Sequence, residues 1–175
     1  MDLLRQALRE QYHAGLAMLD DCIERCPEDA WTSGKHPRTF WRIAYHAAFF
    51  THLYMGQNEA AFQPWPHHRE DADCLWGSDV EPYELPEEIA PYDKAQLLEY
   101  VAFIDSLVDP TIETLNLEAP ETGFPWYKDM TKTSHELMNL RHLGIHVGQL
   151  SELLMARGID TEWIGRARPA APTSP

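Results

Sequence analysis

Segments in which apolar residues recur every three or four positions alternate along this chain with segments rich in proline and charge. The helical spacing is present at about 3–25, 40–56, 93–108 and 133–157. The segment 40–56 is apolar nearly all round, which predicts the most buried helix. Because no segment shows the alternation of a β-strand, the sequence predicts an all-α fold, a four-helix bundle.

Residues that begin helices precede three of these segments. Thr39 is a predicted N-cap for the second. Asp93 and Gln96 have the spacing of a capping box at the third, and Thr133 and Glu136 have it at the fourth. These pairs predict where the helices start.

Residues that stop helices mark the other ends. Pro27 follows the first segment, the second runs to Gly56, and Gly158 stops the fourth. Pro110 leaves two alternatives for the third segment, a kink or the opening of a further turn.

The connection 58–92 is far longer than the roughly 2–8 residues that usually join two helices of a bundle. It could cross the full length of a helix, so the second and third helices could run parallel. Its aromatic residues, Phe62, Trp65, Trp76 and Tyr83, predict that it packs on the bundle as a cover. The predicted single domain covers 1–175, with a core of about 3–158 and an extension at 159–175.

Composition narrows the class of protein. Acidic residues number 28 and basic residues 14, for a net charge of −14, which argues against binding nucleic acid or an anionic membrane surface. The N-terminus does not resemble a signal peptide, and no apolar run is long enough to span a bilayer. Three cysteines in such a chain predict reduced thiols and a cytoplasmic protein. Cys22 and Cys26 continue an apolar stripe and are interpreted as core residues.

The nine histidines call for different interpretations. His13 and His135 are predicted on solvated helix surface. His36, His67 and His68 lie in loops, where solvated or hydrogen-bonding roles are expected. His52, near the end of its segment, is a weak candidate for a site.

His46 lies in the middle of the most apolar segment, where an unsatisfied imidazole would be costly. His142 and His146 are four residues apart, on one face of the last helix. Together they predict a metal site of three imidazoles, which favours Zn²⁺ or Ni²⁺ over Mg²⁺ or Ca²⁺. Asn139, Gln149 and Arg42 are candidates for the residues that support it. The alternative is a set of core histidines that satisfy one another.

The stretches "TFWRIAYHAAFFTHLYMG" and "ELMNLRHLGIHVGQLSELL", with "YDKAQLLEYVAFID" between them, resemble the DinB-like superfamily of bacterial four-helix proteins. The resemblance implies an up-down-down-up bundle with a long crossover between the second and third helices. It also implies a metal triad at His46, His142 and His146, and often a homodimer. Some members use a metal-bound low-molecular-weight thiol in transferase or isomerase reactions.

Two functions therefore remain open. The first is a metal-dependent enzyme, a hydrolase or a thiol-dependent transferase, that acts on a small-molecule substrate. The second is a bundle that holds a metal or a small molecule without turnover. The sequence shows no obvious nucleophile and no unambiguous general base, so it does not separate the two.

Overall fold

The computed structural model describes residues 2–77 and 82–167, and these residues are all helix or loop. The helices are α1 (Asp2–Arg25), α2 (Glu28–Trp31), α3 (Phe40–Met55), the 3₁₀ turn η1 (Glu59–Ala61), α4 (Lys94–Thr114) and α5 (Lys132–Met155). The all-α prediction is confirmed. Within the described ranges, no helix combines the length and the apolar character needed to cross a membrane.

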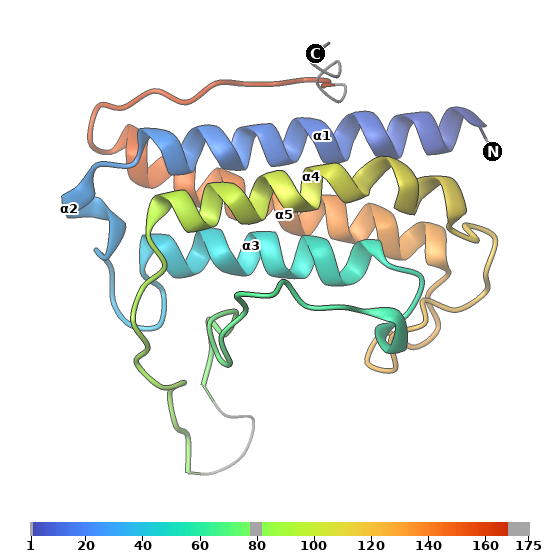
Figure 1. Ribbon diagram of the computed structural model, residues 1–175, viewed down its shortest axis with the longest axis horizontal. Helices are drawn as coiled ribbons and strands as arrows, with labels where there is room; N and C mark the ends of the chain where they lie inside the picture. The colour runs from blue at the N-terminus through green and yellow to red at the C-terminus, as the bar shows by residue number, and fades with distance from the viewer. Residues whose placement is uncertain (1, 78–81, 168–175) are drawn as a thin grey trace.

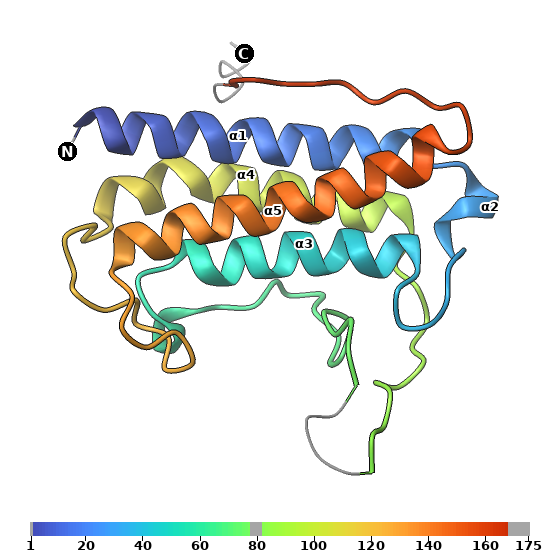
Figure 2. The same cartoon turned by 180° about the vertical axis from the view of Figure 1, so that it is seen from behind.

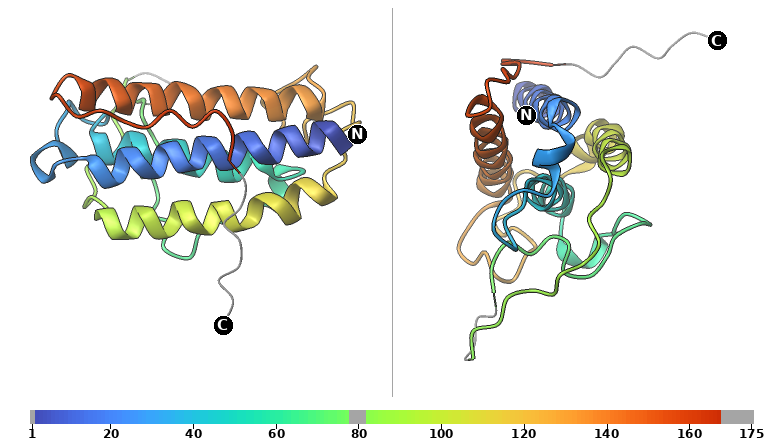
Figure 3. Two further views of the ribbon diagram at one scale, coloured as in Figure 1. Left: turned by 90° about the horizontal axis from the view of Figure 1, so that it is seen from above. Right: turned by 90° about the vertical axis from the view of Figure 1, so that its left-hand side faces the viewer.

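The four long helices lie side by side (Figures 1 and 2). In Figure 1, α3 and α4 run from left to right, whereas α1 and α5 run from right to left. Viewed end on, in the right-hand panel of Figure 3, they surround one core, and α1 and α3 each pack against both α4 and α5. This arrangement places α3 beside α5, the two helices that carry the histidines of the predicted site.

The helix boundaries follow the sequence signals with three differences. The capping box of α4 is confirmed, since Gln96 N donates to Asp93 Oδ1 at 2.8 Å. The start predicted for α5 is wrong: Thr131 is the N-cap, whereas the Thr133 hydroxyl donates to the Leu117 carbonyl at 2.7 Å. The α5 helix also ends at Met155, two residues earlier than predicted.

The third difference concerns the end of α4, which lies at Thr114 and not at about residue 108, with Pro110 inside the helix. Proline removes one backbone donor, but Ile112 and Leu115 beyond it are buried against the core. Arg5 of α1 also reaches across and donates to the Leu115 carbonyl at 2.7 Å. This packing and the Arg5 bond favour continuation of the helix to Thr114.

The long connection covers one side of α3 and α4, as predicted, within the part of it that the structure describes. Trp65 is buried and stacks on Tyr100 of α4 with ring centroids 4.7 Å apart. Tyr92 stacks on Tyr45 of α3 at the same distance. Trp76 is 47% exposed and Tyr83 is 62% exposed, so this part of the cover is only partly buried.

The prediction that His13 and His135 lie on solvated surface is wrong, because both are buried. His13 faces two carboxylates of α4, with Nδ1 2.6 Å from Asp105 and Nε2 3.5 Å from Asp109. Burial alone would lower the pKa of His13, but these carboxylates outweigh it and raise the pKa. His135 stacks on Phe124 at 4.8 Å.

His135 belongs to a buried polar cluster at the start of α5. Lys132 Nζ lies 2.8 Å from Glu136 Oε1, and both side chains are fully buried. The same ammonium donates to the carbonyls of Tyr54 and Gly56, where α3 ends. Tyr12 of α1 donates to Glu136 Oε2 at 2.6 Å. The cluster thus joins α1, α3 and α5 through an ion pair enclosed in the core.

Acid should weaken the fold through His52, which is surrounded by the rings of Phe62, Tyr100 and Phe103. Burial lowers its pKa to about 4. The unfolded chain takes up a proton below roughly pH 6.5, whereas the folded chain does so only near its own lower pKa. This histidine should therefore stabilise the fold fully above pH 6.5 and lose that contribution, about 1.4 kcal/mol per pH unit, as the pH falls toward 4.

Urea unfolding at a series of pH values measures this slope. His52→Gln cannot be protonated and should show a shallower acid slope than the parent chain. The matched control is His67→Gln, at an exposed position of the long connection, which should keep the parent slope. An unchanged slope in His52→Gln would contradict the assignment.

Candidate metal centre

The packing of α3 on α5 brings together the three histidines predicted from the sequence. His46 comes from the middle of α3, and His142 and His146 come from one face of α5. The Nε2 atom of His142 lies 3.1 Å from Nε2 of His46 and 3.1 Å from Nε2 of His146. One ligand atom from each of the three lies within 4.8 Å of the others, the one such group of potential ligands among the described residues.

The outer hydrogen bonds of two rings fix the direction of their lone pairs. His46 Nδ1 lies 2.6 Å from the carbonyl oxygen of Asp73, so this nitrogen must carry the proton. His146 Nδ1 lies 2.9 Å from Gln149 Oε1, and its proton is placed in the same way. Both rings therefore direct a bare Nε2 lone pair at His142.

Protons cannot satisfy this arrangement fully. A neutral His142 offers at most one Nε2 proton, so at least one lone pair of the other two rings faces no donor. Burial lowers the pKa of His46 to about 3 and that of His142 to about 4, with neighbouring imidazoles adding to both effects. Burial lowers the pKa of His146 as well. The rings are neutral near pH 7, which is the state that binds metal.

The spacing of the nitrogens fits a transition metal. Ligands around a tetrahedral Zn²⁺, with Zn–N bonds of about 2.0–2.1 Å, lie roughly 3.3 Å apart. The two separations of 3.1 Å are close to this value. The donors of the triad are all imidazole nitrogens, which suits zinc or nickel better than the oxygen-seeking ions.

Aromatic rings surround the triad. Phe50 lies 4.6 Å from the His46 ring, and Trp76 meets the same ring edge-on at 5.8 Å. Tyr54 lies 6.5 Å from His142. His46 and His146 are buried, whereas His142 is only partly buried and Trp76 is half exposed. The site therefore lies just below the surface, beside the long connection.

Of the three supporting residues expected from the sequence, Gln149 alone contacts the triad, through His146. The buried Asn139 instead donates to the Tyr12 hydroxyl and to the Thr51 carbonyl. Arg42 reaches the Glu87 carbonyl at 3.0 Å and lies over the Trp41 ring. Both therefore serve the packing of the core and of the long connection through these contacts.

The Asp73 carbonyl is a supporting group that sequence reasoning missed. Every residue carries a carbonyl, so no residue type marks one that will orient a histidine. The only signal was the length and aromatic content of the connection. These features predicted that it packs on the bundle, but not which of its residues lies beside His46.

Two of the loop histidines, His36 and His68, form hydrogen bonds outside the triad. His68 Nδ1 is 2.7 Å from the Tyr45 hydroxyl, and His36 Nε2 is 2.7 Å from the Pro86 carbonyl. Cys22 and Cys26 are free and buried, which confirms their interpretation as core residues.

Comparison of the chain with protein-family models, with curated proteins and with solved structures finds no match.

Proposed function

We propose that this protein is a DinB-like, divalent-metal-binding protein whose metal ligands are His46, His142 and His146. The observation that carries the proposal is the pair of Nε2 lone pairs, fixed by Asp73 and Gln149, that converge on the third imidazole. The opposite directions of α1 and α5 relative to α3 and α4 in Figure 1 support the up-down-down-up four-helix bundle of that superfamily.

Zinc or nickel is the proposed metal, and the proposed activity is that of a hydrolase or a thiol-dependent transferase. His46, His142 and His146 would hold the ion with three ligands, and a bound ion would supply a Lewis acid able to lower the pKa of a water or thiol. The chain's own residues hold the imidazoles neutral and aimed inward. Phe50 and Trp76 limit the access of water and offer an apolar wall to a small-molecule substrate.

A binding protein without turnover is the second candidate. The triad's ring neighbours Phe50 and Trp76 favour this function, because neither carries a group that could act as a general base. Tyr54, near His142, is the third ring neighbour. Burial raises the pKa of Tyr54, which keeps its hydroxyl neutral.

Metal removal separates these functions. Protein purified without an affinity tag should contain about one zinc or nickel per chain, and chelation should remove it while the helical circular dichroism remains. Thiol-dependent and hydrolytic substrates should turn over only with metal present. Activity that persists after complete chelation would exclude a metal-dependent enzyme, and bound metal without any turnover would favour the binding protein.

The remaining proposals concern partners. A homodimer is supported by the outer face of α5, where Leu137 is 53% exposed and Ile145 is 52% exposed. A solution mass of a single 20.2 kDa chain would contradict it.

The acidic charge supports the absence of a nucleic-acid or membrane partner. The free thiols support a cytoplasmic location.

A further inference from the structure

A cavity of about 250 Å³ lies between α3, α4 and the start of the long connection, and His52 borders it. We call it the His52 cavity. The ring of His46 packs against His142 of α5, whereas the ring of His52 packs edge-on against Tyr100 and Phe103 of α4. The His52 cavity is therefore on a different side of α3 from the metal triad.

The lining of the His52 cavity is mainly apolar. Met55 of α3, Phe62 of the long connection, and Phe103 and Leu107 of α4 all belong to it. Among the described residues, the lining contains no acidic side chain and no basic one besides His52. Burial lowers the pKa of His52 to about 4, so this ring is neutral near pH 7. Such a lining favours an uncharged occupant, because it holds no ion that could offset the desolvation of a charge.

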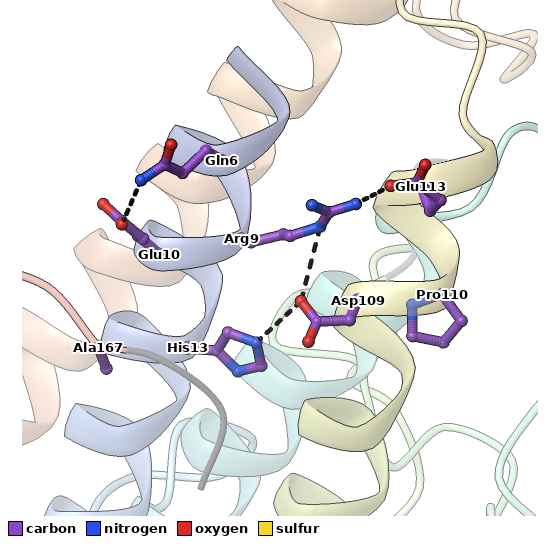
Figure 4. A pocket seen from close by; sticks show the side chains of 8 residues that line it. All are labelled: Gln6, Arg9, Glu10, His13, Asp109, Pro110, Glu113 and Ala167. Carbon is purple, nitrogen blue, oxygen red and sulfur yellow. Dashed lines mark hydrogen bonds and ion pairs between the residues drawn. The ribbon is translucent and has the colours of Figure 1, made fainter. Parts of the chain in front are cut away.

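The cavity between α1 and α4 has a different chemistry. Arg9 and His13 of α1 extend there toward Asp109 and Glu113 of α4 (Figure 4). Arg9 pairs with Glu113, and His13 Nε2 lies 3.5 Å from Asp109. Residues 159–167 run back along α1 and reach the same cavity. Charged groups pair with one another there, whereas the His52 cavity offers a polar group without a partner.

One hydrogen bond fixes the tautomer of His52. Its Nδ1 lies 3.1 Å from the hydroxyl of Tyr100, whose side chain is fully buried. This hydroxyl has no other partner within the described ranges. If Nδ1 carried the proton, the Tyr100 O–H would have no acceptor in the core, which is costly. The favoured arrangement therefore has the hydroxyl donating to Nδ1 and the proton of the neutral ring on Nε2.

The Nε2–H group of His52 is left without an acceptor among residues 2–77 and 82–167. Only 8% of the His52 surface is exposed. Unlike the unpartnered Nε2 of His135, however, this nitrogen is not enclosed by protein. A nine-tenths buried residue thus keeps an accessible donor at the wall of an apolar cavity, where an acceptor on the occupant would satisfy it.

The size and the walls of the cavity indicate the shape of the occupant. An apolar cavity of about 150 Å³ is large enough to bind benzene. The His52 cavity, at about 250 Å³, has room for one aromatic ring with a small substituent. Phe62 and Phe103 both border it and can pack edge-to-face or offset against such a ring.

We propose that the His52 cavity binds a neutral molecule with one aromatic ring and an oxygen atom that accepts a hydrogen bond from His52 Nε2. The ring of the ligand packs against Phe62 and Phe103. This site is separate from the metal triad, and the proposal does not depend on the metal.

Calorimetric titration of the full chain with acetophenone tests the class of ligand. Acetophenone combines one aromatic ring with a carbonyl acceptor, and it should bind with a Kd below about 1 mM. Benzoate has a similar shape but carries a charge, so a tenfold excess, on the order of 10 mM, should not displace acetophenone. A Kd above about 1 mM for acetophenone, or its displacement by benzoate, would overturn the proposal.

Two alanine positions locate the site. Ala61 is exposed and borders the cavity, so Ala61→Phe should fill the space that the ligand needs and weaken acetophenone binding about tenfold or more. The matched control is Ala60→Phe, at an exposed neighbouring position outside the lining, which should keep the parent affinity. Circular dichroism checks that both variants fold. Equal affinities in the two variants would place the ligand elsewhere.

A second pair of ligands tests the hydrogen bond. In α-methylstyrene a CH₂ group replaces the carbonyl oxygen of acetophenone, so the shape is kept and the acceptor is lost. His52→Leu should weaken acetophenone binding by a factor about 2- to 13-fold larger than it weakens α-methylstyrene binding, because a net hydrogen bond has this effect. The comparison between ligands cancels changes in the shape of the cavity. Equal losses for the two ligands would show that His52 only shapes the cavity, and would overturn the proposed contact.

Discussion

Replacing His142 with alanine is expected to lower the affinity of this protein for Zn²⁺ by more than about 100-fold. His142 lies between the other two rings, 3.1 Å from each Nε2. Loss of even an outer hydrogen-bond partner of a metal ligand costs about 10–100-fold. Removal of the central ligand should exceed this, whereas Gln149→Ala, which frees only the outer nitrogen of His146, should fall within it.

Competition titration against a chelator of known affinity measures these losses, with circular dichroism as the check on folding. The control is His67→Ala, because His67 is exposed and packs edge-on against Trp65 at 5.0 Å, away from the triad. Its affinity should equal that of the parent chain. If His142→Ala bound zinc as tightly as His67→Ala, the triad would not be the metal site.

Replacing Lys132 with methionine is expected to lower the free energy of unfolding by about 3–5 kcal/mol. The substitution keeps most of the buried side-chain volume but leaves the Glu136 carboxylate without its cation. It also leaves the carbonyls of Tyr54 and Gly56 without the Lys132 donor. Burial already raises the pKa of Glu136 to about 7 despite the ammonium, and losing that ammonium should raise the pKa further.

Urea unfolding at pH 8 measures the loss. Adding Glu136→Leu to Lys132→Met removes the unpaired carboxyl and should recover part of the stability, because apolar replacement of a whole buried pair is often neutral or stabilising. The control is Arg157→Met, which breaks the exposed pair with Asp29 and should cost less than about 1 kcal/mol. A loss in Lys132→Met no larger than in this control would show that the buried pair contributes little.

The sequence by itself determined the local structure and the ligands of the candidate site. The spacing of apolar residues located α1, α3, α4 and α5, and the Asp93–Gln96 pair located the start of α4, because both signals depend on neighbours within a few residues. The triad was also predictable. An imidazole inside an apolar helix and two imidazoles one turn apart are local patterns with few low-energy explanations.

Tertiary structure decided which polar groups are buried and what they contact. His135 was predicted on solvated surface and Glu136 in a capping box. Both are instead enclosed together with Lys132, because α1, the end of α3 and the loop before α5 close over them. The Asp73 carbonyl accepts a hydrogen bond from His46 Nδ1 because the long connection packs against α3 and places this residue beside the imidazole. The same rule applies to residues 159–167, whose course along α1 could not be predicted from the sequence. Burial and pairing of a polar group depend on the residues that approach from other elements, and spacing along the chain does not encode that approach.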